Sequence, residues 1–230
     1  KNEKGWVIVI DPGHGGKDPG ALGSISREKD ITLAIALKTG AYIEQNIKNA
    51  TVIYTRRDDS TVELRDRPKI ANKANADLFI SIHANWAKVK NVAGAETYIM
   101  GHAKDQANLE VAMTENAVML LEDDYTAKYE GFDPKSSESY IMFELLQDAF
   151  LDQSLRFASI LQSNFKELAQ RRDREVRQAG FLVLRETSMP SVLIETGYLS
   201  NKKENSFLMT DAGRSEIAHS IYGSLVIYLN

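Results

Sequence analysis

The chain has 230 residues, of which 43% are hydrophobic and 26% are charged, enough apolar material for one sizeable core. It contains no cysteine, so disulfides, thiolate metal sites and a cysteine nucleophile are excluded. The net charge of −4 does not favour a nucleic-acid partner, and no run of about 20 apolar residues is present to span a membrane. We expect one domain over residues 1–230.

Strand and helix patterns alternate along the chain. From the N-terminus, aliphatic runs predict strands at Trp6–Asp11, Thr51–Arg56, Asp77–Asn85, Ala93–Met100, Gln178–Glu186 and Pro190–Tyr198. Helical patterns lie at residues 31–47, with Asp30 as N-cap, at 62–75, and at 210–229, with Asp211 as N-cap. Aliphatic strands that alternate with helices predict an α/β fold with a mostly parallel sheet covered by helices on both faces.

The middle of the chain departs from this alternation. Between Gly101 and about residue 170 the strand patterns stop, and we expect a helix over 105–124, a loop over 125–138 and one long helix over 138–170. Residues 105–152 hold twelve Asp and Glu against two Lys, a balance of −10 that leaves +6 for the rest. A solvated acidic surface and a separate functional insertion both explain this charge. Its coincidence with the helical segment favours the insertion.

Polar residues stand at the ends of the predicted strands. His14 follows the first strand, His83 lies near the end of the third, and Glu195 lies in the last. Ligands bind beyond the carboxyl ends of strands in such sheets, so these side chains could converge. Two histidines and a glutamate such as Glu28 are the ligand types of a catalytic zinc site, which keeps a fourth position for water. Taken singly, each has an ordinary structural explanation as a turn histidine, a surface glutamate or a salt-bridged glutamate.

Five segments together are more specific than any one residue. IDPGHGGKDPGA, REKDITLAIALK, LRDRPKIAN, LFISIHAN and PSVLIETGYLSN occur in this order between about residues 7 and 201. They resemble the successive motifs of the zinc-dependent N-acetylmuramoyl-L-alanine amidases of the cell-division type. The resemblance covers almost the whole chain and implies a single catalytic domain with a mixed six-stranded sheet flanked by helices.

The resemblance also implies roles for individual residues. It makes His14, Glu28 and His83 the ligands of one Zn²⁺ ion and Glu195 the catalytic carboxylate. Asn85 falls beside the site, where it supports a ligand or binds substrate. The implied reaction is hydrolysis of the peptidoglycan amide that joins the lactyl group of N-acetylmuramic acid to L-alanine, with Glu195 as general base. Two further motif residues, Arg67 and Asn72, are interpreted as structural.

Relatives of this kind carry a helical insertion that covers the active site until a protein activator displaces it. Residues 106–153 occupy the matching place in the chain order, and we expect them to be a regulatory insertion. Its candidate metal cap is Glu115, because the resemblance includes a Glu-Asn pair on this helix. The other acids considered for this role are Glu110, Glu122 and Glu144.

Two other functions stay open on sequence grounds. One is a zinc peptidase that cleaves an ordinary peptide bond, and the other is a catalytically dead peptidoglycan-binding regulator. For the amidase we expect peptidoglycan and a protein activator as partners and the periplasm or cell envelope as the location. This location requires a signal peptide removed from the chain, because the opening KNEKGW is not one.

Overall fold

A computed structural model describes residues 5–144 and 149–230 of the chain. Its centre is a six-stranded sheet with the spatial order β2-β1-β3-β6-β4-β5. The strands are β1 (Trp6–Pro12), β2 (Ala50–Tyr54), β3 (Leu78–Asn85), β4 (Ala95–Met100), β5 (Asp173–Ala179) and β6 (Ser191–Tyr198). Neighbours pair in parallel except β4 and β6, which are antiparallel. The predicted mixed α/β sheet is confirmed.

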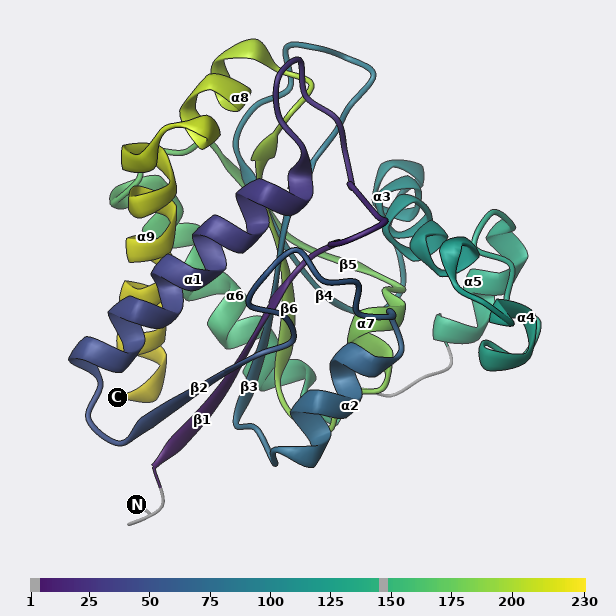
Figure 1. Ribbon diagram of the computed structural model, residues 1–230, viewed down its shortest axis with the longest axis horizontal. Coiled ribbons are helices and arrows are strands. Elements are labelled where there is room, and N and C mark those ends of the chain that lie inside the picture. The colour runs from purple at the N-terminus through teal and green to yellow at the C-terminus, as the bar shows by residue number, and fades with distance from the viewer. Residues whose placement is uncertain (1–4, 145–148) are drawn as a thin grey trace.

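One face of the sheet is covered by the long helices. They are α1 (Glu28–Asn46), α6 (Leu151–Glu167), α8 (Lys202–Met209) and α9 (Asp211–Leu229), on the left and behind the sheet in Figure 1. Their apolar residues, Ile35, Phe157 and Ile221 among them, are fully buried in one core that also includes Ile8 and Ile10 of β1. The burial of such side chains from helices at both ends of the chain holds this layer together.

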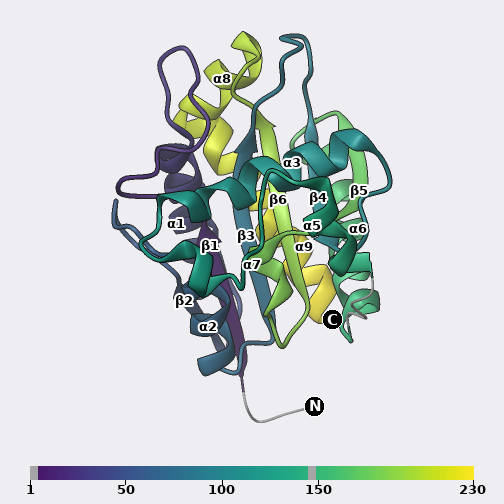
Figure 2. The ribbon, with the colours of Figure 1, turned by 90° about the vertical axis from the view of Figure 1, so that its right-hand side faces the viewer.

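The opposite face carries shorter elements, and Figure 2 looks onto it. They are α2 (Asp66–Lys73), α3 (Gln106–Asn116) with the 3₁₀ turn η1 (Ala117–Leu121), α4 (Tyr125–Lys128), α5 (Ser137–Glu144) and α7 (Leu182–Arg185). Val9, Phe79, Tyr98 and Leu193, from four different strands, form a second buried core with Phe181. Because side chains alternate along a strand, Val9 faces this core while Ile8 and Ile10 face the other.

The predicted strand over Gln178–Glu186 is wrong. β5 ends at Ala179, and the aliphatic run that follows forms the short helix α7. At the junction between β5 and α7, the side chain of Asn116 donates to the Gly180 carbonyl oxygen at 2.8 Å and accepts from the Leu182 amide at 2.9 Å. Those groups therefore do not join the strand ladder. A short apolar run has no periodicity that distinguishes a buried strand from a buried helix.

The single long helix predicted over residues 138–170 is also wrong. α5 ends at Glu144, residues 149–150 form a turn, and α6 starts at Leu151. Residues 145–148, part of the predicted helix, lie outside the described residues. The apolar sides of the two helices serve different cores, since Tyr140 of α5 is buried in one and Phe157 of α6 in the other.

Two predicted helix caps are displaced by one to three residues. α1 begins at Glu28, so Asp30 lies in its first turn, where it pairs with Arg27 at 2.7 Å. α9 is capped by Thr210, whose Oγ1 accepts from Gly213 N at 2.9 Å, rather than by Asp211. None of the described helices is long and apolar enough to cross a bilayer.

Candidate metal centre

The carboxyl ends of β1, β3 and β6 meet at one edge of the sheet. His14 lies two residues past β1, while His83 of β3 and Glu195 of β6 are direct neighbours in the strand register. Glu28 begins α1, which starts at the same edge. The structure thus brings residues from three distant parts of the chain to one place, as their positions at strand ends led us to expect.

Small residues allow these side chains to come together. A Cβ at Gly13 would lie 2.4 Å from the His83 ring, and one at Gly20 would lie 2.6 Å from both Glu28 and His14. His14 itself has a φ of 61°, a left-handed conformation that costs energy in a non-glycine residue. Arg67 holds this turn by donating to the His14 carbonyl oxygen at 2.9 Å. The glycines and Arg67 therefore serve to position His14.

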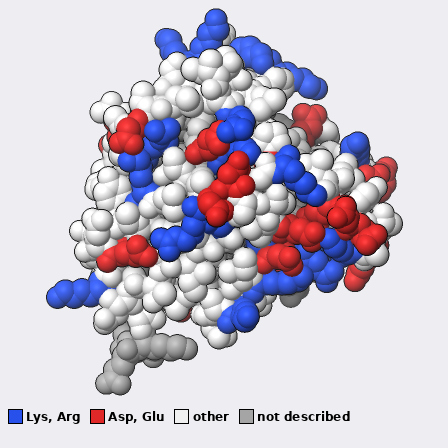
Figure 3. All heavy atoms as spheres, viewed as in Figure 1, with Lys and Arg blue, Asp and Glu red and all other residues white. Residues whose placement is uncertain are grey.

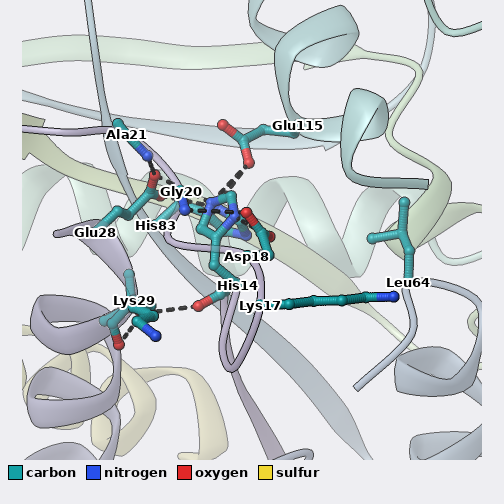
Figure 4. A network of polar contacts seen from close by, with 12 residues as sticks. His14, Lys17, Asp18, Gly20, Ala21, Glu28, Lys29, Leu64, His83 and Glu115 are labelled. Atoms are coloured by element: carbon teal, nitrogen blue, oxygen red, sulfur yellow. Dashed lines mark hydrogen bonds and ion pairs between the residues drawn. The ribbon is translucent and has the colours of Figure 1, made fainter. Parts of the chain in front are cut away.

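Four buried side chains form the cluster drawn in Figure 4. His14 Nε2 lies 3.0 Å from Glu28 Oε2 and 3.3 Å from Glu115 Oε2. His83 Nδ1 lies 3.1 Å from Glu28 Oε1 and 2.9 Å from Glu115 Oε2. One nitrogen or oxygen from each residue lies within 4.8 Å of all the others.

Neighbouring groups orient the cluster. Asp18 Oδ2 lies 2.6 Å from His14 Nδ1, so the other ring nitrogen, Nε2, faces Glu28 and Glu115. Glu28 is held at both oxygens, accepting from Ala21 N at 2.7 Å and from Ala84 N at 2.9 Å. Asp18 was missed as a functional residue. The only signal for it was a carboxylate four positions after His14 in the same motif.

The donor set fits a metal ion. Two imidazoles and two carboxylates are zinc-type ligands, and the four residues are buried together. Glu115 Oε2 and His14 Nε2 approach each other without the geometry of a hydrogen bond, as ligands around a shared centre do. Without a metal the cluster favours protons: although burial lowers the pKa of His83, Glu115 and Glu28 raise it to about 10.

Glu195 lies beside the cluster but outside it. Its side chain is fully buried, and neither carboxylate oxygen has a hydrogen-bond partner among the described residues. Burial raises the pKa of Glu195 well above its ordinary range, and the charge of Glu115 adds to the effect. A buried carboxyl with a raised pKa and free oxygens, next to a candidate metal site, is suited to accept and return a proton.

Among the insertion acids considered as caps, Glu115 of α3 joins the cluster. Glu110 is exposed on the same helix, where it accepts from Gln106 at 3.3 Å. Glu122 instead accepts from Leu64 N at 2.8 Å and from the Tyr129 hydroxyl. The side chain of Glu144 lies outside the described residues.

Asn85 stands at the mouth of the site. Its Oδ1 accepts from Trp86 N at 2.7 Å, while its buried Nδ2 has no hydrogen-bond partner in the described part of the chain. Asn72, in contrast, has a structural place, because it bonds to the backbone of Glu186 and Ser188. Asn85 is therefore the motif asparagine with a donor left over for a ligand.

Two grooves flank α3 at this edge. One, of about 650 Å³, reaches His14, Glu28 and Glu115. The other, of about 660 Å³, extends over β4 and β5. Both are lined by Asn85, Trp86 and Thr114, so the two grooves adjoin at these residues.

The fold and the cluster define an α/β domain with a metal-binding edge, and the comparisons give its family. The Amidase_3 family, N-acetylmuramoyl-L-alanine amidase, matches residues 8–226. The chain is 34% identical to N-acetylmuramoyl-L-alanine amidase AmiC of Escherichia coli O6:H1, over 96% of this chain and 52% of that protein. For AmiA of Escherichia coli K12 the identity is 33%, covering 97% and 76%. The chain spans about half the length of the AmiC relative.

Solved structures agree. The N-acetylmuramoyl-L-alanine amidase of Clostridium difficile 630 matches with a TM-score of 0.74 at 27% identity, over 99% of this chain and 98% of that one. The catalytic domain of CwlV from Bacillus (Paenibacillus) polymyxa matches with 0.70 at 32% identity, over 97% and 98%. The chain belongs to the N-acetylmuramoyl-L-alanine amidase family, which confirms the resemblance seen in its five motifs.

Proposed function

We propose that the protein is a zinc-dependent N-acetylmuramoyl-L-alanine amidase that hydrolyses the amide between N-acetylmuramic acid and the L-alanine of the stem peptide. The observation that carries the proposal is the buried cluster of His14, Glu28 and His83 with the unpartnered Glu195 beside it. Family membership supplies the substrate class. The absence of cysteine agrees with a hydrolase that needs no thiol nucleophile.

His14, Glu28 and His83 would hold one zinc ion. A bound zinc ion supplies a Lewis acid for the amide carbonyl and makes water available as a nucleophile at neutral pH. Glu195 then takes the proton from the attacking water and returns it to the leaving amide nitrogen, which becomes the amine of L-alanine. We assign Asn85 a contact with the substrate, because its Nδ2 has no hydrogen-bond partner among the described residues and its side chain lines both grooves.

We further propose that residues 106–153 regulate this site. The contacts of Glu115 Oε2 with His14 at 3.3 Å and His83 at 2.9 Å support this proposal, because a carboxylate there would compete with a substrate group or water for the metal. A protein that displaces α3 would open the site. One relative at the level of structure, the CwlD amidase of Clostridioides difficile, is known in complex with the GerS lipoprotein. Peptidoglycan as substrate makes the periplasm or cell envelope the proposed location.

Product analysis tests the reaction. Sacculi or soluble muropeptides are incubated with the zinc-loaded protein, and the products are examined by mass spectrometry. The amidase releases intact stem peptides that begin with L-alanine and leaves the glycan strands whole. Peptides shortened at an internal bond would instead favour the zinc peptidase. Binding without any product would favour the dead regulator.

A further inference from the structure

The groove over β4 and β5 contains a charged cluster that the proposed reaction does not use. Glu96 of β4 is 1% exposed and lies between two guanidinium groups, with Arg174 Nε at 3.2 Å and Arg177 Nε at 3.0 Å. The Tyr98 hydroxyl also donates to Glu96 at 2.9 Å. One carboxylate therefore faces two cations, which leaves an excess positive charge at the wall of the groove.

We propose that this groove binds the stem peptide and that Arg174 and Arg177 recognise a carboxylate of that peptide on the L-alanine side of the cleaved bond. The inference rests on the proposed amidase function and adds the ligand chemistry of one subsite. The ligand class is an anionic peptide.

The strand register connects the cluster to the reaction centre. His83 lies opposite Glu195, and Glu195 lies opposite Glu96, so the three occupy one row across β3, β6 and β4. β5 with its arginines comes next. Because both guanidiniums reach back to Glu96 of β4, they lie about two strand spacings from His83, roughly 10 Å, the length of about three extended residues. A stem peptide that leaves the site along this row passes the arginines within its first few residues.

A bulge in β5 directs both arginines to this place. Arg174 and Arg177 are three residues apart, and in a regular strand they would face opposite sides of the sheet. Between the pairs Ala95–Asp173 and Thr97–Val176, β5 contains one residue more than β4, and Glu175 there has a φ of 76°. The extra residue lets both guanidiniums reach Glu96. Such bulges commonly re-aim side chains near functional sites.

The arginines keep donors for a ligand. Arg174 donates from Nε to Glu96 at 3.2 Å. Arg177, which is ion-paired with Glu96, donates from Nε to the Arg174 carbonyl oxygen at 3.0 Å and from Nη1 to Asn108 Oδ1 at 2.7 Å. The terminal nitrogens of Arg174 make no hydrogen bond to any described residue, and about a fifth of each arginine side chain is exposed, 22% and 20%. A guanidinium edge of this kind binds a carboxylate with paired hydrogen bonds.

Charge separates this groove from its neighbour. Its charged lining residues are Lys88, Arg174 and Arg177 against Glu96 and Glu110, a net charge of +1. The lining of the other groove, among the residues that the structure describes, includes no lysine or arginine, and its outer wall holds the exposed apolar residues Leu22 and Leu121. An anionic peptide therefore fits the groove over β4 and β5, which leaves the other for the less charged sugar.

The test compares two substrates that differ in one charge. The D-Glu of N-acetylmuramoyl-L-Ala-D-Glu carries two free carboxylates, and in the matched substrate one of them is an amide. We expect the dicarboxylate substrate to have a kcat/KM roughly 10- to 100-fold higher, the worth of charge-assisted hydrogen bonds. Arg174→Gln should lower this ratio toward one, and Arg174→Lys should restore part of it. Arg156→Gln, an exposed arginine of α6, serves as the control that keeps the ratio.

Measurements in a Glu115→Ala background prevent closure by α3 from hiding the effect. Calorimetry with the free product L-Ala-D-Glu and its amide gives a readout that needs no turnover, and thermal unfolding checks that Arg174→Gln folds. Equal turnover and equal binding of the two forms, or an unchanged ratio in Arg174→Gln, would overturn the inference while the amidase function stands. Failure to cleave either substrate would contradict the proposed function itself.

Discussion

Glu195 shows how strongly one residue can depend on its surroundings. A fully buried carboxylate without hydrogen-bond partners is costly in a folded protein. Burial therefore favours the neutral carboxyl and raises the pKa of Glu195. The same property makes it useful as a proton carrier. Its stability cost and its proposed catalytic task therefore have one physical origin.

An isosteric substitution tests the proposed role of the Glu195 carboxyl. Glu195→Gln keeps the size of the side chain but removes its ability to accept and return a proton. We expect bound zinc to be unchanged and turnover to fall about 10²- to 10⁴-fold, which metal analysis and muropeptide assays measure in parallel. Turnover close to that of the unchanged protein would show that Glu195 is not the base.

A second variant tests whether Asp18 holds His14 in place for metal binding. Asp18→Asn keeps the shape of the side chain beside His14 Nδ1 but removes the carboxylate that lies 2.6 Å away. We expect zinc affinity to weaken about 10- to 100-fold. Competition with a chelator measures it, and Asp66→Asn, which alters a half-exposed carboxylate of α2 that pairs with Lys69 at 2.7 Å, is the matched control.

The proposed metal ligands could be predicted from sequence motifs, whereas the arginines of the groove over β4 and β5 could not. His14, Glu28 and His83 stand in recognisable segments, and the structure brings them together. Arg174 and Arg177 lie in a strand that the sequence pattern misplaced, and their common direction depends on a bulge at Glu175. A bulge of this kind leaves no periodic signal in the sequence.

Among the elements, α3 is the one on which the proposed closure of the site depends. It is fixed by Asp105, which caps it by accepting from Asn108 N at 2.9 Å, and by Asn116, which bonds to the start of α7. Glu115 lies between these two residues on α3 and contacts His14 and His83. Acidic side chains gather over α4 and α5, on the right of Figure 3, with basic ones beside them. The exposed acids there include Asp123, Asp124 and Glu138 of the helical segment.

A matched pair of variants tests the closure. Glu115→Ala removes the carboxylate that contacts His14 and His83, whereas Asp123→Ala changes an exposed acid of the same segment that lines neither groove. We expect hydrolysis of sacculi to rise about tenfold in the first, the effect of weakening the closed state by about 1.4 kcal/mol, and to stay constant in the second. An equal or lower rate in a folded Glu115→Ala protein would contradict the proposed role of α3.

Deletion of residues 106–153 is the stronger version of this experiment. It also removes Ala112, Met119 and Tyr140, which are buried against the sheet, so part of a core is lost with the helix. The point variants avoid this cost.

At the scale of the whole molecule, the alternation of strands and helices was enough to predict the α/β fold. The direction of β4 could not be predicted in this way, because it depends on the length of the loop before it rather than on a hydrophobic pattern. The loop over residues 86–94 has no helix and is too short for the crossover that a parallel neighbour needs, so β4 runs against β6. The sequence pattern did not predict helix α7 for a related reason, since packing and the hydrogen bonds from Asn116 determine its conformation.

The whole protein should also respond to pH through the cluster. The pKa of His83 rises from 6.5 to about 10 on folding without metal, so the native state binds more protons than the unfolded state between these values. This stabilisation is complete below pH 6.5 and is lost as the pH rises to about 10. Urea unfolding of the metal-free protein should show the decline, and His83→Gln should flatten it. A stability that does not fall over this range would contradict the coupling.

In the proposed amidase, His14, Glu28 and His83 hold one zinc ion. Crystals of the zinc-loaded protein, measured on both sides of the zinc absorption edge, test it directly. We predict a single anomalous peak with His14 Nε2, His83 Nδ1 and a Glu28 oxygen each at about 2.0–2.2 Å. A peak elsewhere, or one without both histidines, would contradict the account.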